Sequence, residues 1–449
     1  MLAVATRAVR VLFMCCLMTV VAGCLPARSF LGTESPVEAG LNPANLIDAV
    51  AQAEADAELN PHALYEIAQR AQTANKPAVI PPKRSILVLS GGGNYGAYTA
   101  GVLCGWTDIG TRPQFDVVTG ISTGALAAPL AFLGSRYDPQ LKEFYTTMKS
   151  TDLFRIKKSL RSLLSESLAD NAPLAKKVRE MVTPELLREI AAEHAKGRRL
   201  FIGTTELESR RFIVWDMGEI ATRGTPKDAE LFCNVLLGSS AIPGFFPPSR
   251  IAVNVDGAEY VERHVDGGVS AALFFRPPYV PPERRNDPTA KSLYGSDVYI
   301  IVAGKLYADP DVIKPRALQI AGNSVSAVIY SQTRGDLTRL FTISLLTGMN
   351  YYMAAIPAEF NAPKSSTDFE PVEMTAMFDE GVRQVRQGTV WRRSPPGVEP
   401  GESPLERYGS RLTRVTRTVS GPITNAPMQG MFVPLSPDGI PTSPNPVAK

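Results

Sequence analysis

Short apolar runs alternate with helical segments from about residue 83 onward. Runs of strand composition lie at 86–90, 115–119, 200–205, 211–216, 251–255 and 297–303. Segments with helical spacing lie at 139–196, 315–347 and 373–387. Strands that alternate with helices indicate helices packed on both faces of a sheet. We therefore predict an α/β protein with three layers, α/β/α, around a central and mostly parallel sheet.

The two ends of the chain differ from this core. We divide the chain into a leader at 1–23, a tether with a helical segment at 24–82, a core domain at 83–391 and a tail at 392–449. The tail is rich in proline and glycine and has no apolar periodicity, so we expect it to be largely disordered. The helical insert at 139–196 either covers a site or only packs against the core.

The N-terminus has the order of a secretory signal peptide. Arg7 and Arg10 precede an apolar run at 11–21, which is too short to span a bilayer, and small residues follow it. The sequence Val21-Ala22-Gly23-Cys24 also resembles the lipobox of bacterial lipoproteins. The resemblance implies lipidation of Cys24, which would tether the protein to a membrane surface. Because no aspartate follows Cys24, it also favours the outer membrane of the bacterial cell envelope. An ordinary signal peptide is the alternative.

Charge and cysteine content exclude some partners. The 449 residues carry a formal charge of +3 without a basic run, so no nucleic acid partner is expected. Cys104 and Cys233 lie in apolar segments and are predicted to be buried free thiols. No spacing typical of metal ligands occurs, and we expect neither a metal nor a cofactor.

A glycine-rich loop follows the first predicted strand. After the apolar run come Gly91-Gly92-Gly93-Asn94-Tyr95-Gly96, and then a segment of helical composition. A strand, a glycine loop and a helix in this order present unpaired N–H groups and the positive end of the helix dipole. We expect Gly91, Gly92, Gly93 and Asn94 to hold an anion, either a phosphate or a transition-state oxyanion. The loop lacks the lysine of a P-loop, which disfavours a nucleotide.

The second predicted strand runs into Gly120-Ile121-Ser122-Thr123-Gly124 and then into a helix. This is the strand–turn–helix context of a nucleophile elbow, in which a tight turn exposes the serine hydroxyl. Gly120 and Gly124 are expected where a Cβ would collide with neighbouring backbone. Ser122 is thus the candidate nucleophile of an acyl-transfer site.

A serine nucleophile needs a base, and two candidates follow from the residues. His62 and His194 lie in polar segments and are expected at the surface, which leaves His264 for a Ser-His-Asp triad. Asp266 ends a strand-like alternation and precedes Gly267 and Gly268, at the sheet edge where α/β sites assemble. By itself, Asp266 is better explained as a turn residue that caps the following segment.

Taken together, Gly91–Gly96, Gly120–Gly124 and Asp266-Gly267-Gly268 resemble the signature of the patatin-like phospholipases. Segments 238–248 and 203–209 resemble two further stretches of that family, and the resemblance covers about residues 84–305. It implies a Ser122–Asp266 dyad, an oxyanion hole in the glycine loop and close backbone packing at the motif glycines Gly96, Gly120, Gly124, Gly267 and Gly268.

The resemblance further implies a serine acyl hydrolase that cleaves carboxylic esters of lipids, of the phospholipase A or esterase type, without a cofactor. Tyr95 stands where the family often has an arginine, so a preference for anionic headgroups is not implied. Two alternatives stay open: a triad esterase that uses His264, and a non-catalytic lipid-binding lipoprotein of the envelope.

Overall fold

The computed structural model describes residues 81–157, 165–255, 258–284, 286–309, 316–396 and 398. The predictions for the leader, Cys24, the tether and His62, and for nearly all of the tail, lie outside these residues.

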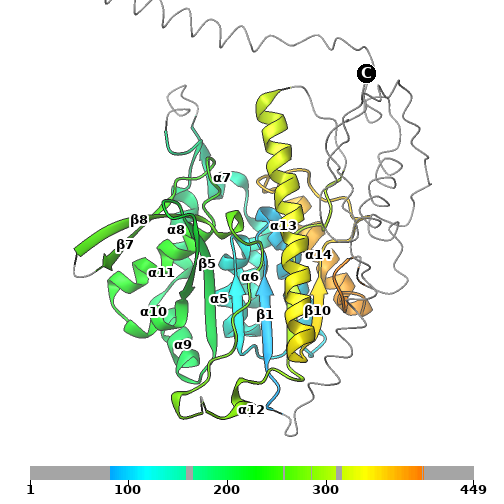
Figure 1. Ribbon diagram of the computed structural model, residues 1–449. Coiled ribbons are helices and arrows are strands. Elements are labelled where there is room, and N and C mark those ends of the chain that lie inside the picture. The colour runs from blue at the N-terminus through cyan, green and yellow to red at the C-terminus, as the bar shows by residue number, and fades with distance from the viewer. Residues whose placement is uncertain are drawn as a thin grey trace, which may run out of the picture.

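An eight-stranded mixed sheet forms the centre of the domain (Figure 1). Its order is β10-β9-β1-β2-β5-β8-β7, and β6 also pairs with β5. The strands are β1 (Ser85–Leu89), β2 (Val117–Gly120), β5 (Arg199–Glu206), β6 (Arg211–Asp216), β7 (Ser249–Val255), β8 (Ala258–Asp266), β9 (Asp297–Ile301) and β10 (Asn350–Ala354). The run from β10 to β5 is parallel, whereas β6, β7 and β8 are antiparallel to their neighbours. The predicted mostly parallel sheet is confirmed.

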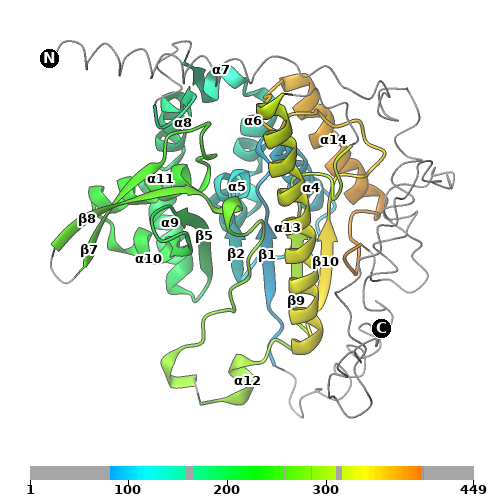
Figure 2. The same ribbon diagram turned by 45° about the horizontal axis from the view of Figure 1, so that its top comes forward.

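Helices cover both faces of the sheet (Figure 2). Because side chains alternate along a strand, Ile86 and Val88 of β1 face one way and Leu87 and Leu89 the other. The first pair packs with α13 (Ala317–Thr347). The second pair packs in a larger core formed mainly by α4 (Gly96–Asp108), α5 (Thr123–Leu133), α6 (Asp138–Thr147), α8 (Ala172–Met181), α9 (Pro184–Ala195), α11 (Pro226–Ser239) and α14 (Pro371–Gln387). The three-layer α/β/α fold is therefore confirmed.

Some elements differ from the prediction. Strand β10 was not predicted, although it pairs in parallel with β9 along its whole length. The insert at 139–196 contains α6, α7 (Ser150–Leu153), α8 and α9, and also a small hairpin of β3 (Arg155–Ile156) and β4 (Ala169–Asp170). The segment at 315–347 forms the single long helix α13. Among the described helices, none has the length and hydropathy needed to cross a membrane.

Candidate active site

Ser122 lies in a sharp turn between the end of β2 and the start of α5. Its backbone has φ 54° and ψ −124°, a conformation that is strained for a residue with a side chain. The two motif glycines permit this turn, because a Cβ on Gly120 would lie 2.5 Å from the Gly124 carbonyl oxygen. A Cβ on Gly124 would lie 2.5 Å from the carbonyl oxygen of Ser90. The structure thus has the elbow geometry that the motif predicts.

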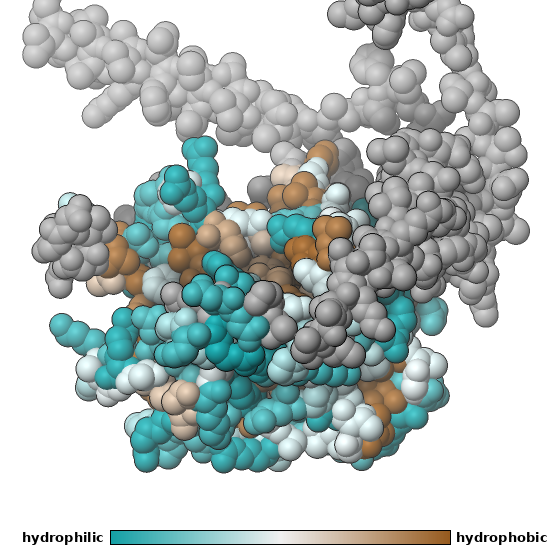
Figure 3. Space-filling view, turned by 60° about the horizontal axis from the view of Figure 1, so that its bottom comes forward, coloured by the Kyte–Doolittle hydropathy of each residue, from teal (hydrophilic) through white to brown (hydrophobic). Residues whose placement is uncertain are grey.

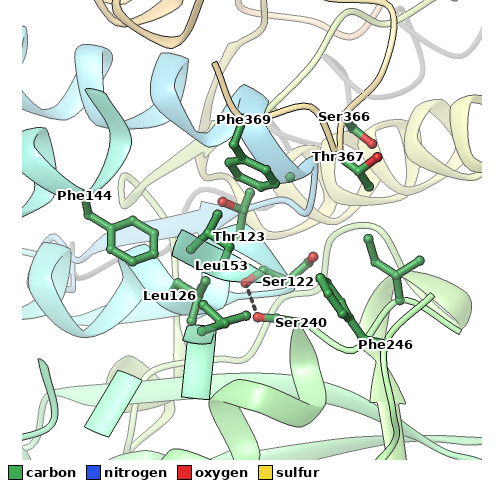
Figure 4. Close-up of a pocket in the computed structure, with 13 residues that line it drawn as sticks. Ser122, Thr123, Leu126, Phe144, Leu153, Ser240, Phe246, Ser366, Thr367 and Phe369 are labelled. Carbon is green, nitrogen blue, oxygen red and sulfur yellow. Dashed lines mark hydrogen bonds between the residues drawn. The ribbon is translucent and has the colours of Figure 1, made fainter. Parts of the chain in front are cut away.

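Ser239, at the end of α11, holds this turn in place. Its hydroxyl accepts a hydrogen bond of 3.0 Å from the N–H of Ser122 and donates one of 2.6 Å to the Gly203 carbonyl at β5. Ser239 is completely buried. The neighbouring Ser240 donates to the Ser122 carbonyl oxygen over 3.3 Å (Figure 4). The sequence alone did not indicate this role, since segment 238–248 entered only through the family resemblance.

Asp266 ends β8 beside the elbow. Its carboxylate accepts a hydrogen bond of 2.7 Å from the Gly268 N–H, and the Ser122 hydroxyl lies close enough to favour its charged form. Burial raises the pKa of Asp266 to about 6, although the Ser122 hydroxyl and the Gly268 N–H both favour the charged form and oppose the increase. Asp266 is therefore a stronger base than an exposed carboxylate but is still mostly ionised at neutral pH.

Gly267 lets the end of β8 approach β5 closely. A Cβ on Gly267 would lie 2.6 Å from the Gly203 carbonyl oxygen, the same oxygen that accepts from Ser239. The N–H of Asp266 donates to the Ala241 carbonyl over 2.9 Å. The end of β5 and the residues after α11 therefore position both Ser122 and Asp266.

The glycine loop lies directly against Ser122. A Cβ on Gly91 would lie 3.0 Å from the Ser122 Cβ and 3.7 Å from its Oγ. Gly92 and Gly93 have φ of 155° and 57°, and a Cβ on either would overlap a carbonyl oxygen, of Ala303 and Ser366 respectively. Only glycine fits at these two positions. Among the described residues, no acceptor pairs with the N–H groups of Gly91, Gly92 or Gly93. These three groups can hold an oxyanion formed at Ser122.

Asn94 does not fit the expected role in the oxyanion hole. Its backbone N–H donates to the Ser366 carbonyl over 2.9 Å, so it is not available to an anion. Its buried side-chain amide donates to the carbonyls of Ser365 and Asp368. The Tyr95 hydroxyl, in the position where the family often has arginine, donates to the carbonyl of Pro363. Asn94 and Tyr95 thus fasten the segment 363–369 over the glycine loop.

Gly96 begins α4 and brings it against the elbow helix. A Cβ on Gly96 would lie 2.3 Å from the Thr123 Oγ1 and 2.4 Å from the ring of Tyr145. The N-terminus of α4 can therefore lie close to the start of α5.

This arrangement has a counterpart among known families. Residues 87–279 match the family model described as patatin-like phospholipase. The chain carries a patatin-like phospholipase domain. The match to this family supports the activity of a lipid ester hydrolase.

Two solved structures show weak similarity to the chain. One is VipD from Legionella pneumophila, with 12% identity over 69% of this chain and 67% of that chain, at a TM-score of 0.33. The other is the type III effector protein ExoU, with 15% identity over 69% of this chain and 53% of that chain, at a TM-score of 0.25. No curated protein sequence matches the chain. Similarity at these TM-scores carries no conclusion about this protein.

The histidines of the patatin-like domain have other partners than Ser122. His264 is completely buried, with Nδ1 2.9 Å from the Thr204 hydroxyl and Nε2 3.0 Å from a carboxylate oxygen of Glu262. Both ring nitrogens are thus occupied away from the nucleophile. His194 ends α9 near Asp216, and it is half-buried rather than at the surface as predicted. The geometry gives no support to a triad.

A pocket opens beside Ser122 in the patatin-like domain (Figure 4). It measures about 480 Å³ including the solvent at its mouth. Gly93, Ser122 and Thr123 form part of its wall, and the Ser366–Thr367 stretch of the fastened segment forms another part. Its apolar lining includes Leu126, Phe144, Leu174, Ile242, Phe246 and Phe369. The pocket thus brings an apolar surface to the nucleophile.

The two cysteines in the described part of the chain are buried free thiols, as predicted. Burial raises the pKa of Cys104 to about 12 and that of Cys233 to about 11. Neither is a reactive nucleophile at neutral pH. The described residues contain no group of three or more histidine, cysteine, aspartate or glutamate side chains that could hold a metal ion.

Proposed function

We propose that this patatin-like domain hydrolyses carboxylic esters of lipids through a dyad of Ser122 and Asp266. The observation that supports this most directly is that the Ser122 hydroxyl lies close enough to the buried carboxylate of Asp266 to favour its charged form. Two motifs far apart in the chain are thus neighbours in the fold, with the glycine loop beside them, as a nucleophile and its base require.

In the proposed reaction, Asp266 accepts the hydroxyl proton as Ser122 Oγ attacks the ester carbonyl. The negative charge that develops on the carbonyl oxygen is held by the N–H groups of Gly91, Gly92 and Gly93, each worth about 2.7–4 kcal/mol of barrier. The C–O bond then breaks, the alcohol leaves with the proton from Asp266, and the acyl group stays on Ser122. Water, with Asp266 again as base, attacks this ester and releases the fatty acid.

The lining of the pocket suits the acyl part of the substrate better than a polar headgroup. Phe144, Phe246 and Phe369 are among the side chains that would contact an acyl chain next to the reacting carbonyl. Burial of each methylene in such a site contributes about 0.8 kcal/mol. We therefore propose that the acyl chain provides most of the binding.

Acyl release tests this proposal. The purified chain is assayed on a medium-chain p-nitrophenyl ester and on phospholipid vesicles, next to Ser122→Ala and Asp266→Asn. We expect both variants to lose turnover, and His264→Gln to keep most of it. Turnover that survives in Ser122→Ala would contradict the assignment. A folded wild-type protein without turnover on any ester would favour a lipid-binding role instead.

We also propose that Cys24 is lipidated and anchors the protein at the outer membrane of a bacterial envelope. The support is the sequence Val21-Ala22-Gly23-Cys24 after an apolar leader. A Cys24→Ser variant should move from the membrane fraction to the soluble fraction, and it should no longer incorporate labelled palmitate. Unchanged fractionation and labelling would contradict the anchor.

A further inference from the structure

The long helix α13 has two halves with different surroundings. In the half after Arg334, the side chains of Leu337, Leu340 and Phe341 are buried against the sheet. The half before it, Ala317–Thr333, contains no charged residue. Most of its side chains face solvent, including Ile320 (50% exposed), Val325 (59%), Val328 (62%) and Ile329 (49%). We call residues 317–333 the outer half of α13.

The outer half extends beyond the edge of the sheet at which the site lies. Arg334 donates to the carbonyl of Leu306, which closely follows the end of β9. Burial raises the pKa of Tyr95 in the glycine loop to about 12, and the nearby Tyr330 adds to this increase. The helix therefore leaves the body of the domain beside the glycine loop, and at 1.5 Å per residue the outer half is about 25 Å long. In Figure 1 the upper end of α13 stands above the strands.

The exposed side chains of the outer half do not continue the core. Val328 precedes Leu337 by nine residues, which is two and a half helical turns. Since Leu337 faces the sheet, Val328 faces away from it. Its exposure is thus not a gap in the packing of the domain. This side of the helix lacks a partner among the described residues.

A second exposed apolar edge lies on the other side of the pocket. In the β3–β4 hairpin region, Ile156 is 54% exposed and Leu168 is 44% exposed. The Leu168 N–H donates to the Gly244 carbonyl over 2.9 Å, within the segment whose Ile242 and Phe246 line the pocket. Figure 3 shows hydrophobic side chains, in brown, gathered in the upper part of one face of the molecule.

Cationic side chains accompany both edges. Arg155 and Lys157 flank Ile156 and are exposed, and exposed Arg316 precedes the outer half of α13. Apolar side chains bordered by cations are typical of surfaces that enter the headgroup region of a bilayer. A bilayer is also where a lipid ester substrate resides.

We propose that the outer half of α13, together with Ile156 of β3 and Leu168 just before β4, docks this domain onto an anionic lipid bilayer with the pocket mouth facing the lipid. This inference rests on the proposed function, since it names the aggregate from which the site takes its substrate. The described chain begins at Pro81, just before β1, at the edge of the sheet opposite the pocket. A lipid anchor at Cys24 would tether the domain without fixing which face meets the membrane, and the proposed contact would orient the pocket.

The test uses the full chain with Cys24→Ser in every arm, so that no acyl anchor contributes. Binding is measured by cosedimentation with phosphatidylcholine vesicles, with or without phosphatidylglycerol. These chains also carry Ser122→Ala, which excludes turnover, and the chain with only these two changes is the parent of the binding assay. We expect Val325→Asp/Val328→Asp to lower vesicle partitioning about 10-fold or more. Leu346→Asp is the matched control, because Leu346 is 59% exposed at the other end of the same helix. It should bind as the parent does.

Turnover of soluble p-nitrophenyl butyrate, measured with Ser122 intact in every chain, distinguishes an error in the docking surface from an error in the proposed catalytic site. We expect equal turnover in the parent and in Val325→Asp/Val328→Asp, which also shows that the variant is folded. If the variant does not fold, Val328→Asn alone replaces it and should lower binding to a smaller extent.

Several results would overturn the proposal. They are a parent that does not bind vesicles, a double variant that binds like the parent, and a Leu346→Asp control that loses binding equally. A parent dimer that becomes monomeric in the double variant, with vesicle binding unchanged, would assign the surface to a second copy of the chain.

Discussion

The raised pKa of Asp266 allows us to predict how both the activity and the stability of the protein depend on pH. A carboxyl group that binds its proton more tightly in the folded chain weakens the fold when it ionises. For Asp266 this destabilisation is absent below the ordinary pKa of 3.8, develops as the pH rises, and is complete above about 6. The difference between 3.8 and about 6 corresponds to about 3 kcal/mol.

Replacing Asp266 by asparagine removes the charge and keeps the shape. The side-chain oxygen of the asparagine can still accept the 2.7 Å hydrogen bond from the Gly268 N–H. We therefore expect Asp266→Asn to raise the free energy of unfolding by about 1–3 kcal/mol near pH 8 and by almost nothing near pH 4. The same variant should have no measurable turnover, since an amide cannot accept the Ser122 proton.

Urea unfolding followed by tryptophan fluorescence measures the stability, at several pH values between these limits. The matched control is Asp379→Asn, an exposed aspartate on α14, for which we expect a change within about 0.5 kcal/mol. In the wild-type protein, kcat/KM should fall about tenfold per pH unit below about 6 and level off above it, because Asp266 must be ionised to act as a base.

The reasoning is refuted if Asp266→Asn is folded but less stable than the wild type near pH 8. A kcat/KM that stays level well below the expected pKa would refute it as well. In either case the buried carboxylate would be stabilised by interactions other than those with the Ser122 hydroxyl and the Gly268 N–H.

Three further predictions follow from single contacts. Ser239→Ala removes the hydrogen bond that the Ser122 N–H donates, so kcat should fall about 10-fold with KM nearly unchanged. A variant in which neither kcat nor KM changes would contradict a positioning role for Ser239. His264→Gln should lower the free energy of unfolding by about 1–3 kcal/mol in a urea titration. Its turnover of a soluble ester should stay within about threefold of the wild type. A loss of turnover in the folded variant would instead support a triad that uses His264. Phe369→Ala enlarges the pocket, so a series of p-nitrophenyl esters should show a shift towards longer acyl chains, and an unchanged profile would place the acyl chain elsewhere.

Much of the fold could be predicted from the sequence because the evidence for each strand is local. Each strand of the parallel sheet except β10 has an apolar run that ends in glycine or polar residues. The run at β10, Asn350–Ala354, is short and closely follows a long helix, so it was not recognised as a strand. Its pairing with β9 makes it a strand, and pairing is decided by packing rather than by its own five residues.

The candidate site divides in the same way. The sequence by itself indicated Ser122 and the glycines around it, because a tight turn or a close approach of backbones requires glycine at fixed places near the candidate nucleophile. Asp266 became the candidate base only when the three motifs were taken together. The tertiary structure alone decided that Asn94 fastens a distant segment, that Ser239 holds the elbow and that His264 is occupied elsewhere. It also decided the raised pKa of Asp266 and the direction in which Val328 faces. These properties depend on what surrounds a side chain in space, and segments far apart in the chain provide that surrounding.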